Sequence, residues 1–509
     1  MFPIEFLYAS CRRTPKAAAI ETENEVVTYA SLVEQVNALA AALQALEEKP
    51  QSRVAICGYN SLEHLIGLLA VMAAGKVWIP LNPRDGRDDI QLKIEAAQPS
   101  ILILDEDCED RVGLFKGKKI VGFGGRLTAM DTIAGLIEKN LGKRPKSNNY
   151  NGENIQAIKF TGGSSGRPKG VLQPYRAWLT GAACMINELK LTSGDRYLVC
   201  SPLTHGTSCY ITPILGVGGT LVLGKRIMKP PDILDAFKKR GITTSFIPPT
   251  VIYMMMLELG SKEQKFPMLS RLIYGGAPMP SGKIRAAQGV FGPVLATNYG
   301  QTEAPQIVTY LSPNEMLIEK NIESVGRSSF LTRVSIMEPN GNEELPQGKT
   351  GEIVVSGDLL MSEYLDMPDA TSAVKTGNWL RTGDVGLLDD RGYLFIKDRL
   401  RDVIISGGFN VYPSDVEAAL VKHPAIYECV VYGLPDEKWG EIVQASVVLQ
   451  KGGKADEIEM LEFSKKVLGS VKSPKNIKTI SDLPRSSVGK VLRREVRENA
   501  LLESKNSFD

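Results

Sequence analysis

Phe160-Thr-Gly-Gly-Ser-Ser-Gly-Arg-Pro-Lys-Gly-Val171 begins at the end of the apolar run 157–160, which has the pattern of a buried strand. The four glycines let backbone N–H groups turn toward an anion, and three hydroxyls and a lysine add donors and positive charge. No G-x4-G-K-S/T spacing fits, so this is not a Walker A loop. A flexible surface turn is the alternative, but the closing Pro-Lys-Gly is unusual in one. The segment therefore predicts a strand followed by a polyphosphate-binding loop.

Apolar, β-branched runs alternate with helix-period segments on both sides of this loop. The expected strands are 53–57, 77–81, 101–104, 157–160, 196–200, 243–247, 271–274 and 294–298, and the expected helices are 61–74, 89–97, 175–189 and 233–240. Alternation of this kind favours α/β architecture with parallel, doubly wound sheets. Near residue 325 the pattern changes to short strands and glycine turns, at 351–356 and 392–396. We therefore expect a small β-barrel-like subdomain over about 325–399.

The last hundred residues have an α+β pattern of their own. Ser414-Asp-Val-Glu417 has the spacing of a capping box and predicts a helix to about residue 422. Strands at 428–432 and 443–449 and a helix at 457–468 follow. The charged run 397–402 marks the boundary. We therefore expect a large domain over 1–399 and a small C-terminal domain over 400–509, since 509 residues exceed one hydrophobic core.

Composition excludes several classes of partner. Sixty basic and fifty-eight acidic residues give a net charge of +2, so nothing indicates nucleic acid binding. The apolar runs are shorter than the ~20 residues that span a bilayer, and the N-terminus lacks a secretory pattern. Seven scattered cysteines without a CxxC pair argue against disulfides and zinc. We expect a cytoplasmic protein without a transmembrane segment.

Further motifs follow the glycine loop in a fixed order. They are Pro202-Leu-Thr-His205, Tyr274-Gly-Gly-Ala-Pro-Met279, Tyr299-Gly-Gln-Thr-Glu303, Thr382-Gly-Asp384, Asp398-Arg-Leu-Arg-Asp-Val-Ile-Ile-Ser-Gly-Gly-Phe-Asn410 and Pro484-Arg-Ser-Ser-Val-Gly-Lys490. In this order they resemble the signatures of the adenylate-forming superfamily, which includes acyl-CoA synthetases, peptide-synthetase adenylation domains and luciferases. The resemblance covers nearly the whole chain.

The resemblance implies a nucleotide site, and the chain offers suitable residue types for it. Tyr299 offers an aromatic face to adenine, and Asp384 is expected to accept hydrogen bonds from both ribose hydroxyls. A core aromatic is the alternative for Tyr299, and a surface salt bridge is the alternative for Arg399. The implied ATP-binding residues are Thr161, Gly163, Ser164, Ser165, Gly166, Lys169, Gly275, Gly276, Ala277, Pro278, Asn298, Tyr299, Gly300, Asp384 and Arg399.

The same resemblance implies four catalytic residues, Thr302, Glu303, Lys490 and His205. Glu303, next to Thr302, is the expected Mg²⁺ ligand, because a cation that also binds phosphate needs only one or two carboxylates. The alternative, an acidic residue at a helix start, is compatible with this role. Lys490 is expected to stabilise the charge that builds on the α-phosphorus, although by composition alone it belongs to a solvated basic surface. His205 is expected to orient the acyl carboxylate rather than act as a base.

The family uses a mobile C-terminal domain in two half-reactions, and this implies a hinge and a coenzyme A site. Arg401 is at the hinge position, where relatives more often have Lys or Asp. Ser406, Gly407 and Gly408 are expected to line the pantetheine path, with a simple tight turn as the alternative. Gly162 is a second departure, because many relatives have a hydroxyl residue there; backbone donors remain, so we expect ATP to bind.

The favoured function is an ATP-dependent acyl-CoA ligase that uses ATP, Mg²⁺ and coenzyme A. A stand-alone adenylation enzyme that loads a carrier protein is the alternative, and a catalytically inactive scaffold is a third. The expected pocket segments, 205–210, 243–252 and 274–298, contain aromatic residues and no evident arginine partner for a second carboxylate. We therefore expect a hydrophobic fatty or aromatic monoacid and a place in fatty acid metabolism. The sequence leaves open whether the chain forms a homodimer.

Overall fold

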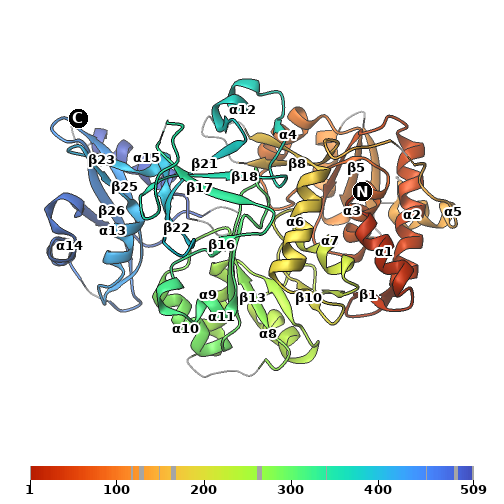
Figure 1. Cartoon of the computed structure of the whole chain (residues 1–509), viewed down its shortest axis with the longest axis horizontal. Helices are drawn as coiled ribbons and strands as arrows, with labels where there is room; N and C mark the ends of the chain where they lie inside the picture. The colour runs from red at the N-terminus through yellow and green to blue at the C-terminus, as the bar shows by residue number, and fades with distance from the viewer. Residues whose placement is uncertain are drawn as a thin grey trace. The chain divides into compact units, whose positions relative to one another are not determined.

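The structure is a computed structural model that describes residues 2–115, 118–124, 131–147, 149–161, 168–260, 266–339, 341–453, 455–485 and 491–506. Figure 1 shows the chain coloured from its N-terminus to its C-terminus. The chain forms two compact units. The first comprises Met1–Val334 with Val355–Leu380, and the second comprises Ser335–Val354 with Arg381–Asp509.

An eight-stranded sheet in the first unit carries the predicted phosphate loop. Its order is β19-β9-β8-β4-β3-β5-β6-β7, parallel from β8 to β7 and antiparallel at β8–β9 and β9–β19. The strands are β3 (Arg53–Cys57), β4 (Val77–Leu81), β5 (Ile101–Asp105), β6 (Lys119–Phe123), β7 (Asp131–Thr132), β8 (Ile155–Thr161), β9 (Lys169–Pro174) and β19 (Glu363–Tyr364). The predicted strands 53–57 and 77–81 are confirmed to the residue.

A nine-stranded sheet also belongs to the first unit. Its order is β16-β15-β14-β13-β12-β10-β11-β1-β2, parallel from β14 to β1 and antiparallel at both edges. The strands are β1 (Ala18–Glu21), β2 (Val26–Thr28), β10 (Arg196–Val199), β11 (Thr220–Leu223), β12 (Thr244–Phe246), β13 (Arg271–Tyr274), β14 (Leu295–Tyr299), β15 (Thr309–Leu311) and β16 (Arg327–Ser328). The alternating pattern therefore predicted doubly wound sheets correctly.

Helices connect these strands. They are α1 (Glu5–Arg13), α2 (Tyr29–Leu46), α3 (Leu62–Ala73), α4 (Arg87–Ala97), α5 (Ile133–Asn140), α6 (Tyr175–Glu188), α7 (Ser208–Gly216), α8 (Pro230–Lys239), α9 (Pro249–Leu259), α10 (Ser281–Phe291), α11 (Pro313–Met316) and α12 (Pro368–Val374), with short 3₁₀ segments η1 (Glu106–Phe115) and η2 (Glu319–Asn321). None of the helices in the described part of the chain is long and apolar enough to cross a membrane.

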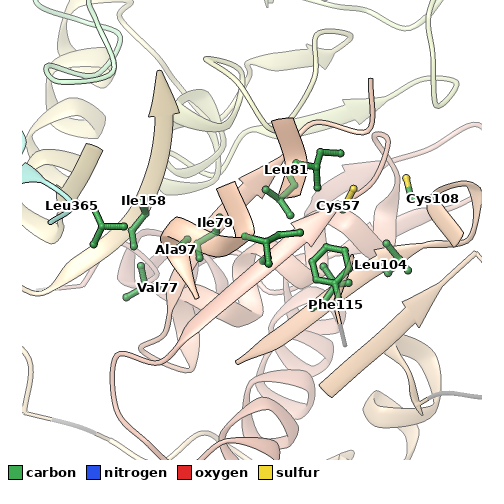
Figure 2. Packing of buried hydrophobic residues seen from close by; sticks show 14 residues of the cluster. Cys57, Val77, Ile79, Leu81, Ala97, Leu104, Cys108, Phe115, Ile158 and Leu365 are labelled. Atoms are coloured by element: carbon green, nitrogen blue, oxygen red, sulfur yellow. The ribbon is translucent and has the colours of Figure 1, made fainter. Parts of the chain in front are cut away.

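The core around the eight-stranded sheet explains why the sequences of its strands are continuous apolar runs. Cys57 pairs in register with Leu81 on one side and with Leu104 on the other, and all three side chains are fully buried. Figure 2 shows them on neighbouring strands with Phe115 in the same cluster. Because helices cover both faces of a parallel sheet, residues on both faces of its strands are buried.

Two five-stranded sheets complete the fold. One has the order β17-β18-β21-β20 with β22 beside β21, and the other has the order β24-β23-β26-β25 with β27 beside β26. The first contains β17 (Arg333–Met337), β18 (Gly351–Ser356), β20 (Lys375–Thr376), β21 (Trp379–Leu388) and β22 (Leu394–Arg399). The second contains β23 (Ile404–Ser406), β24 (Phe409–Val411), β25 (Ile426–Asp436), β26 (Gly440–Leu449) and β27 (Asn476–Thr479), and is accompanied by η3 (Leu400–Asp402), α13 (Pro413–Leu420), α14 (Glu457–Lys472) and α15 (Arg493–Asn506).

The predicted capping box at the start of α13 is wrong. The helix begins at Pro413, with Tyr412 as its N-cap and no side-chain cap. Proline fits the first helical position because its φ is already helical and its missing N–H would have no partner there. Ser414 Oγ instead donates to the carbonyl of Lys397, and Glu417 accepts from the backbone N–H of Val431 at 2.8 Å.

Candidate functional site

The two ends of the predicted phosphate loop are cross-strand partners. Thr161 ends β8, Lys169 begins β9, and the two lie opposite each other in the antiparallel ladder. The loop itself, with Gly162, Gly163, Ser164, Ser165 and Gly166, lies outside the described residues. The segment therefore joins two antiparallel strands, and the β-ladder fixes the distance between its ends.

Tyr364 connects Lys169 with Glu303 in the first unit. Its hydroxyl donates to Glu303 Oε1 at 2.7 Å, and Lys169 Nζ lies 5.0 Å from the centroid of its ring. The backbone around Glu303 is also held, because Gln173 Nε2 donates to the carbonyl of Thr302 at 2.8 Å and Met361 N donates to the carbonyl of Glu303 at 2.8 Å. The structure thus brings together the predicted metal ligand and the predicted phosphate lysine.

The chemistry of Glu303 fits a cation shared with phosphate. Among the described residues, no group of three or more His, Cys, Asp or Glu side chains could hold a metal alone. A single ordered carboxylate suits Mg²⁺ that takes its other ligands from phosphate and water. Residues 302–304 are bends rather than a helix, so the alternative of a helix-start acid for Glu303 is wrong.

Backbone at the ends of β13 and β14 forms the predicted adenine-binding segments. Tyr299 ends β14 and is 8% exposed, and Asn298 Nδ2 donates to Tyr210 Oη at 2.8 Å. Gly275 is buried directly beside Asn298: a Cβ at Gly275 would lie 2.6 Å from Asn298 Oδ1. Only glycine allows this close approach. Gly276, Ala277 and Pro278 follow it at the partly exposed end of β13, and Gly300 follows β14.

His205 lies in the turn before α7 with a neutral ring at physiological pH. Its Nδ1 is 2.9 Å from Thr204 Oγ1. Burial is the largest cause that lowers the pKa of His205 to about 4; Lys159, Lys93 and Arg84 lower it further, and Asp85 opposes them. A base with so low a pKa is a weak proton acceptor at pH 7. The structure therefore favours an orienting role over proton abstraction.

Aromatic side chains stack on one another near the turn that contains His205. Tyr210 stacks on Phe246 with centroids 5.5 Å apart and on Tyr197 with centroids 5.2 Å apart. The Tyr210 hydroxyl is bonded to Asn298, as above, and Gln306 Nε2 donates to it at 3.3 Å. Tyr210 is fully buried, so it supports the wall of the expected acyl pocket rather than binding through its hydroxyl.

In the second unit, Asp384 and Arg399 are directly paired across β21 and β22. Arg399 Nε lies 2.7 Å from Asp384 Oδ1, and Asp384 is buried while Arg399 is partly exposed. The backbone N–H of Asp384 also donates to Thr382 Oγ1 at 3.1 Å. The salt bridge considered for Arg399 is therefore present, and its partner is the predicted ribose ligand itself.

One arginine holds the segment around the predicted hinge. Arg493, on α15, lies 2.9 Å from an oxygen of Asp398, 3.4 Å from one of Asp402 and 2.9 Å from one of Glu417. The two aspartates flank Arg401, whose side chain is 65% exposed. Burial raises the pKa of the Glu417 carboxyl, while the guanidinium of Arg493 opposes this. Arg493 therefore ties both sides of the hinge position to one helix.

The predicted pantetheine segment is a tight hairpin turn between β23 and β24. Ser406 is buried, and Gly407 and Gly408 have φ values of +58° and +81°. A Cβ at Gly407 would lie 2.9 Å from Cε3 of Trp439, so the turn requires glycine both for conformation and for space. A tight turn is confirmed, and it is compatible with the predicted coenzyme role.

Sequence reasoning missed three residues that contact the predicted site residues or their neighbours. Tyr364, Arg493 and Lys159 were not predicted, because each acts through partners distant in the sequence. The motif position of Arg493, three residues after Lys490, was the only available signal. Lys490 lies outside the described residues.

Comparison with known proteins agrees with these motifs. The family described as AMP-binding enzyme matches residues 7–365, and its C-terminal domain family matches residues 415–490. Feruloyl-CoA synthase from Amycolatopsis sp is 33% identical over 96% of this chain and 96% of its own length. A 2-succinylbenzoate–CoA ligase from Bacillus cereus is 32% identical over 95% of this chain and 96% of its own length. The structure of ATP-bound MatB from Rhodopseudomonas palustris, 26% identical, covers 98% of this chain and 99% of its own with a TM-score of 0.89.

The fold, the ordered motifs and these relatives together define an adenylate-forming enzyme, and the chain belongs to the AMP-binding enzyme family. It falls on the acyl-CoA ligase branch of that family. Its reaction is AMP-forming acid–thiol ligation, in which an acid is first activated by ATP as an acyl-adenylate. The predicted family and reaction class are confirmed.

Proposed function

We propose that this ligase activates a hydrophobic monocarboxylic acid, fatty or aromatic, and transfers it to coenzyme A. The aromatic wall beside His205 carries the proposal, because Phe246 stacks on the buried Tyr210 within the segments expected to form the acyl pocket. Burying an apolar acyl group against such a wall contributes roughly 25 cal/mol per Å². The feruloyl group in the name of one relative supports an aromatic monoacid.

The first half-reaction joins two anions. A carboxylate oxygen attacks the α-phosphorus of ATP, the bond from that phosphorus to pyrophosphate breaks, and acyl-adenylate remains. Negative charge builds on the phosphorus, so a fixed ammonium stabilises the transition state more than the ground state. We assign this role to Lys490, and we assign to the neutral ring of His205 the orientation of the carboxylate.

We assign the other motif residues to separate parts of the nucleotide. Tyr299 and the backbone of residues 275–278 are assigned to adenine, Asp384 and Arg399 to the ribose, and the loop from Thr161 to Lys169 to the phosphates. Glu303, oriented by Tyr364, would hold Mg²⁺, which supplies positive charge to the phosphate oxygens when bound.

The second half-reaction forms the thioester. The thiol of coenzyme A loses its proton and attacks the acyl carbon, and AMP leaves. We propose that the C-terminal domain, residues 400–509, turns about Arg401 between the half-reactions and that Ser406, Gly407 and Gly408 then line the pantetheine path. The seven cysteines are free thiols, which supports a reducing, cytoplasmic location.

A panel of acids tests the proposal. Purified enzyme with Mg²⁺ is offered aryl, medium-chain, long-chain and dicarboxylic acids, and acid-dependent exchange of labelled pyrophosphate into ATP is measured. We expect exchange with apolar monoacids and not with dicarboxylates; activity confined to dicarboxylates would overturn the substrate class. Free coenzyme A and a phosphopantetheinyl carrier protein are then compared as acceptors, and we expect thioester on coenzyme A.

A further inference from the structure

Lys159 is a buried lysine without a counter-ion among the residues that the structure describes. It lies on β8, is 8% exposed, and its Nζ is 5.2 Å from the ring centroids of both Trp78 and Trp178. Its hydrogen bonds go to Ser208 Oγ at 2.9 Å and, weakly, to Cys209 Sγ at 3.9 Å. Burying an ammonium group without a carboxylate partner is unfavourable, and an apolar residue would fill the position without that cost.

The hydrogen bonds of Lys159 lead to His205. An ammonium can only donate, so Ser208 Oγ accepts from Lys159 and directs its own hydrogen to the carbonyl oxygen of His205, 2.7 Å away. The backbone N–H of Ser208 donates to the same carbonyl at 3.3 Å. One hydroxyl group therefore links the lysine to the backbone of the predicted carboxylate-orienting residue.

The turn before α7 is fixed at its other end as well. Thr204 Oγ1 contacts the ring of His205, and the backbone N–H of His205 donates to the carbonyl of Pro202 at 3.1 Å. Four charged groups act on the pKa of the His205 ring: Asp85 raises it, and Lys159, Lys93 and Arg84 lower it. Lys159 also has a hydrogen-bonded path to the backbone of His205 through Ser208.

We propose that Lys159 is a positioning residue for the acid substrate: through Ser208 it holds the backbone of His205 so that the imidazole ring meets the acyl carboxylate. The proposal rests on the orienting role of His205 given above. It assigns the lysine to the acid rather than to ATP, because its contacts are with α6, β4 and the start of α7 and not with the Lys169–Tyr364–Glu303 group.

Two variants separate this role from simple packing. Lys159→Met keeps the length of the side chain and removes the charge, and Ser208→Ala removes only the link. Lys76→Met is the matched control, because Lys76 is also buried and donates to a serine, Ser52 Oγ, at 2.6 Å, outside the proposed site. We expect Lys159→Met and Ser208→Ala to lower kcat/KM for the acid by roughly tenfold or more, as for a lost hydrogen bond to a charged group. The KM for ATP should stay unchanged, and Lys76→Met should leave both constants unchanged.

A His205→Ala background gives the decisive comparison. If Lys159 acts through His205, Lys159→Met added to His205→Ala should cause no further loss in kcat/KM for the acid. The proposal would be overturned if the double variant lost kcat/KM by the product of the two single losses. It would also be overturned if Lys159→Met and Ser208→Ala both kept the wild-type kcat/KM for the acid.

Histidine NMR tests the link between Lys159 and His205 without an enzyme assay. The measurement is practical because the chain has only three histidines. With ¹³C-labelled histidine, Lys159→Met should shift the His205 resonance and raise the pKa of His205, while the resonances of His64 and His423 stay in place. An unchanged His205 resonance would contradict the link. Should the wild-type enzyme exchange pyrophosphate with none of the acids, the proposed function would fail while this spectrum still tested the Lys159–His205 relation.

Discussion

Tyr364 donates its hydroxyl hydrogen to Glu303 at 2.7 Å across 61 residues of sequence, and the same ring lies under the ammonium group of Lys169. The hydrogen bond fixes one oxygen of a carboxylate, and the ring attracts the lysine through its π-face. A single tyrosine therefore contacts both the carboxylate assigned to Mg²⁺ and the ammonium group assigned to the phosphates.

Removing this hydroxyl should weaken the metal site without disturbing the fold. In Tyr364→Phe the ring stays under Lys169, but Glu303 loses its orienting donor. Groups that orient a metal ligand typically contribute 10- to 100-fold in affinity, so we expect the Mg²⁺ concentration for half-maximal pyrophosphate exchange to rise by roughly tenfold. Tyr432→Phe, which removes a hydroxyl bonded to Ser446, is the control. An unchanged Mg²⁺ requirement in Tyr364→Phe would exclude the role.

Lys490→Ala should separate the two half-reactions. Loss of one well-placed charge at the α-phosphorus costs about 3 kcal/mol or more, so adenylate formation should fall by at least roughly 10²-fold. The variant should still convert a supplied acyl-adenylate to the thioester, because that step leaves the phosphorus unattacked. Pyrophosphate exchange and thioester formation are measured on the same preparation, and equal loss of both would contradict this division.

The buried ring of His205 should make stability depend on pH. Its folded pKa of about 4 lies below its ordinary value of 6.5, so between these values the unfolded chain binds a proton that the folded protein does not. The free energy of unfolding therefore falls as pH drops from 6.5 toward 4, through this residue by up to about 3 kcal/mol. Denaturant unfolding of wild type and His205→Asn across this range measures the difference. If the free energy of unfolding depends on pH in the same way in both proteins, His205 contributes nothing to that dependence.

Arg493 should be required for the stability of the second unit. Replacing it with methionine leaves the carboxylates of Asp398 and Glu417 without their partner, and breaking a buried ion pair in this way costs roughly 3–5 kcal/mol. The neighbouring Arg494 pairs with Glu498 on the exposed face of the same helix, so Arg494→Met should cost under about 0.5 kcal/mol. Chemical denaturation gives both values, and similar losses in the two variants would refute the distinction.

The sequence and the structure agree where the signal is local. Strand 53–57 was predicted from an apolar run, because a parallel strand buried on both faces needs little more than that run. Ser414 and Glu417 show a local signal that failed, because their spacing matched a capping box. In the structure the helix begins at Pro413, and Glu417 pairs with Arg493 instead. A competing partner 76 residues away does not appear in a local pattern.

By itself the sequence determined the family, the order of the motifs and the residue types that we assign to ATP. These features lie in short segments whose chemistry is local. Only the tertiary structure showed that Tyr364 orients Glu303, that Arg493 pairs with carboxylates on both sides of the predicted hinge position, and that Lys159 is linked to His205 through Ser208. The physical reason is that a hydrogen bond or ion pair depends on positions within about 3 Å, and folding alone brings such distant residues that close.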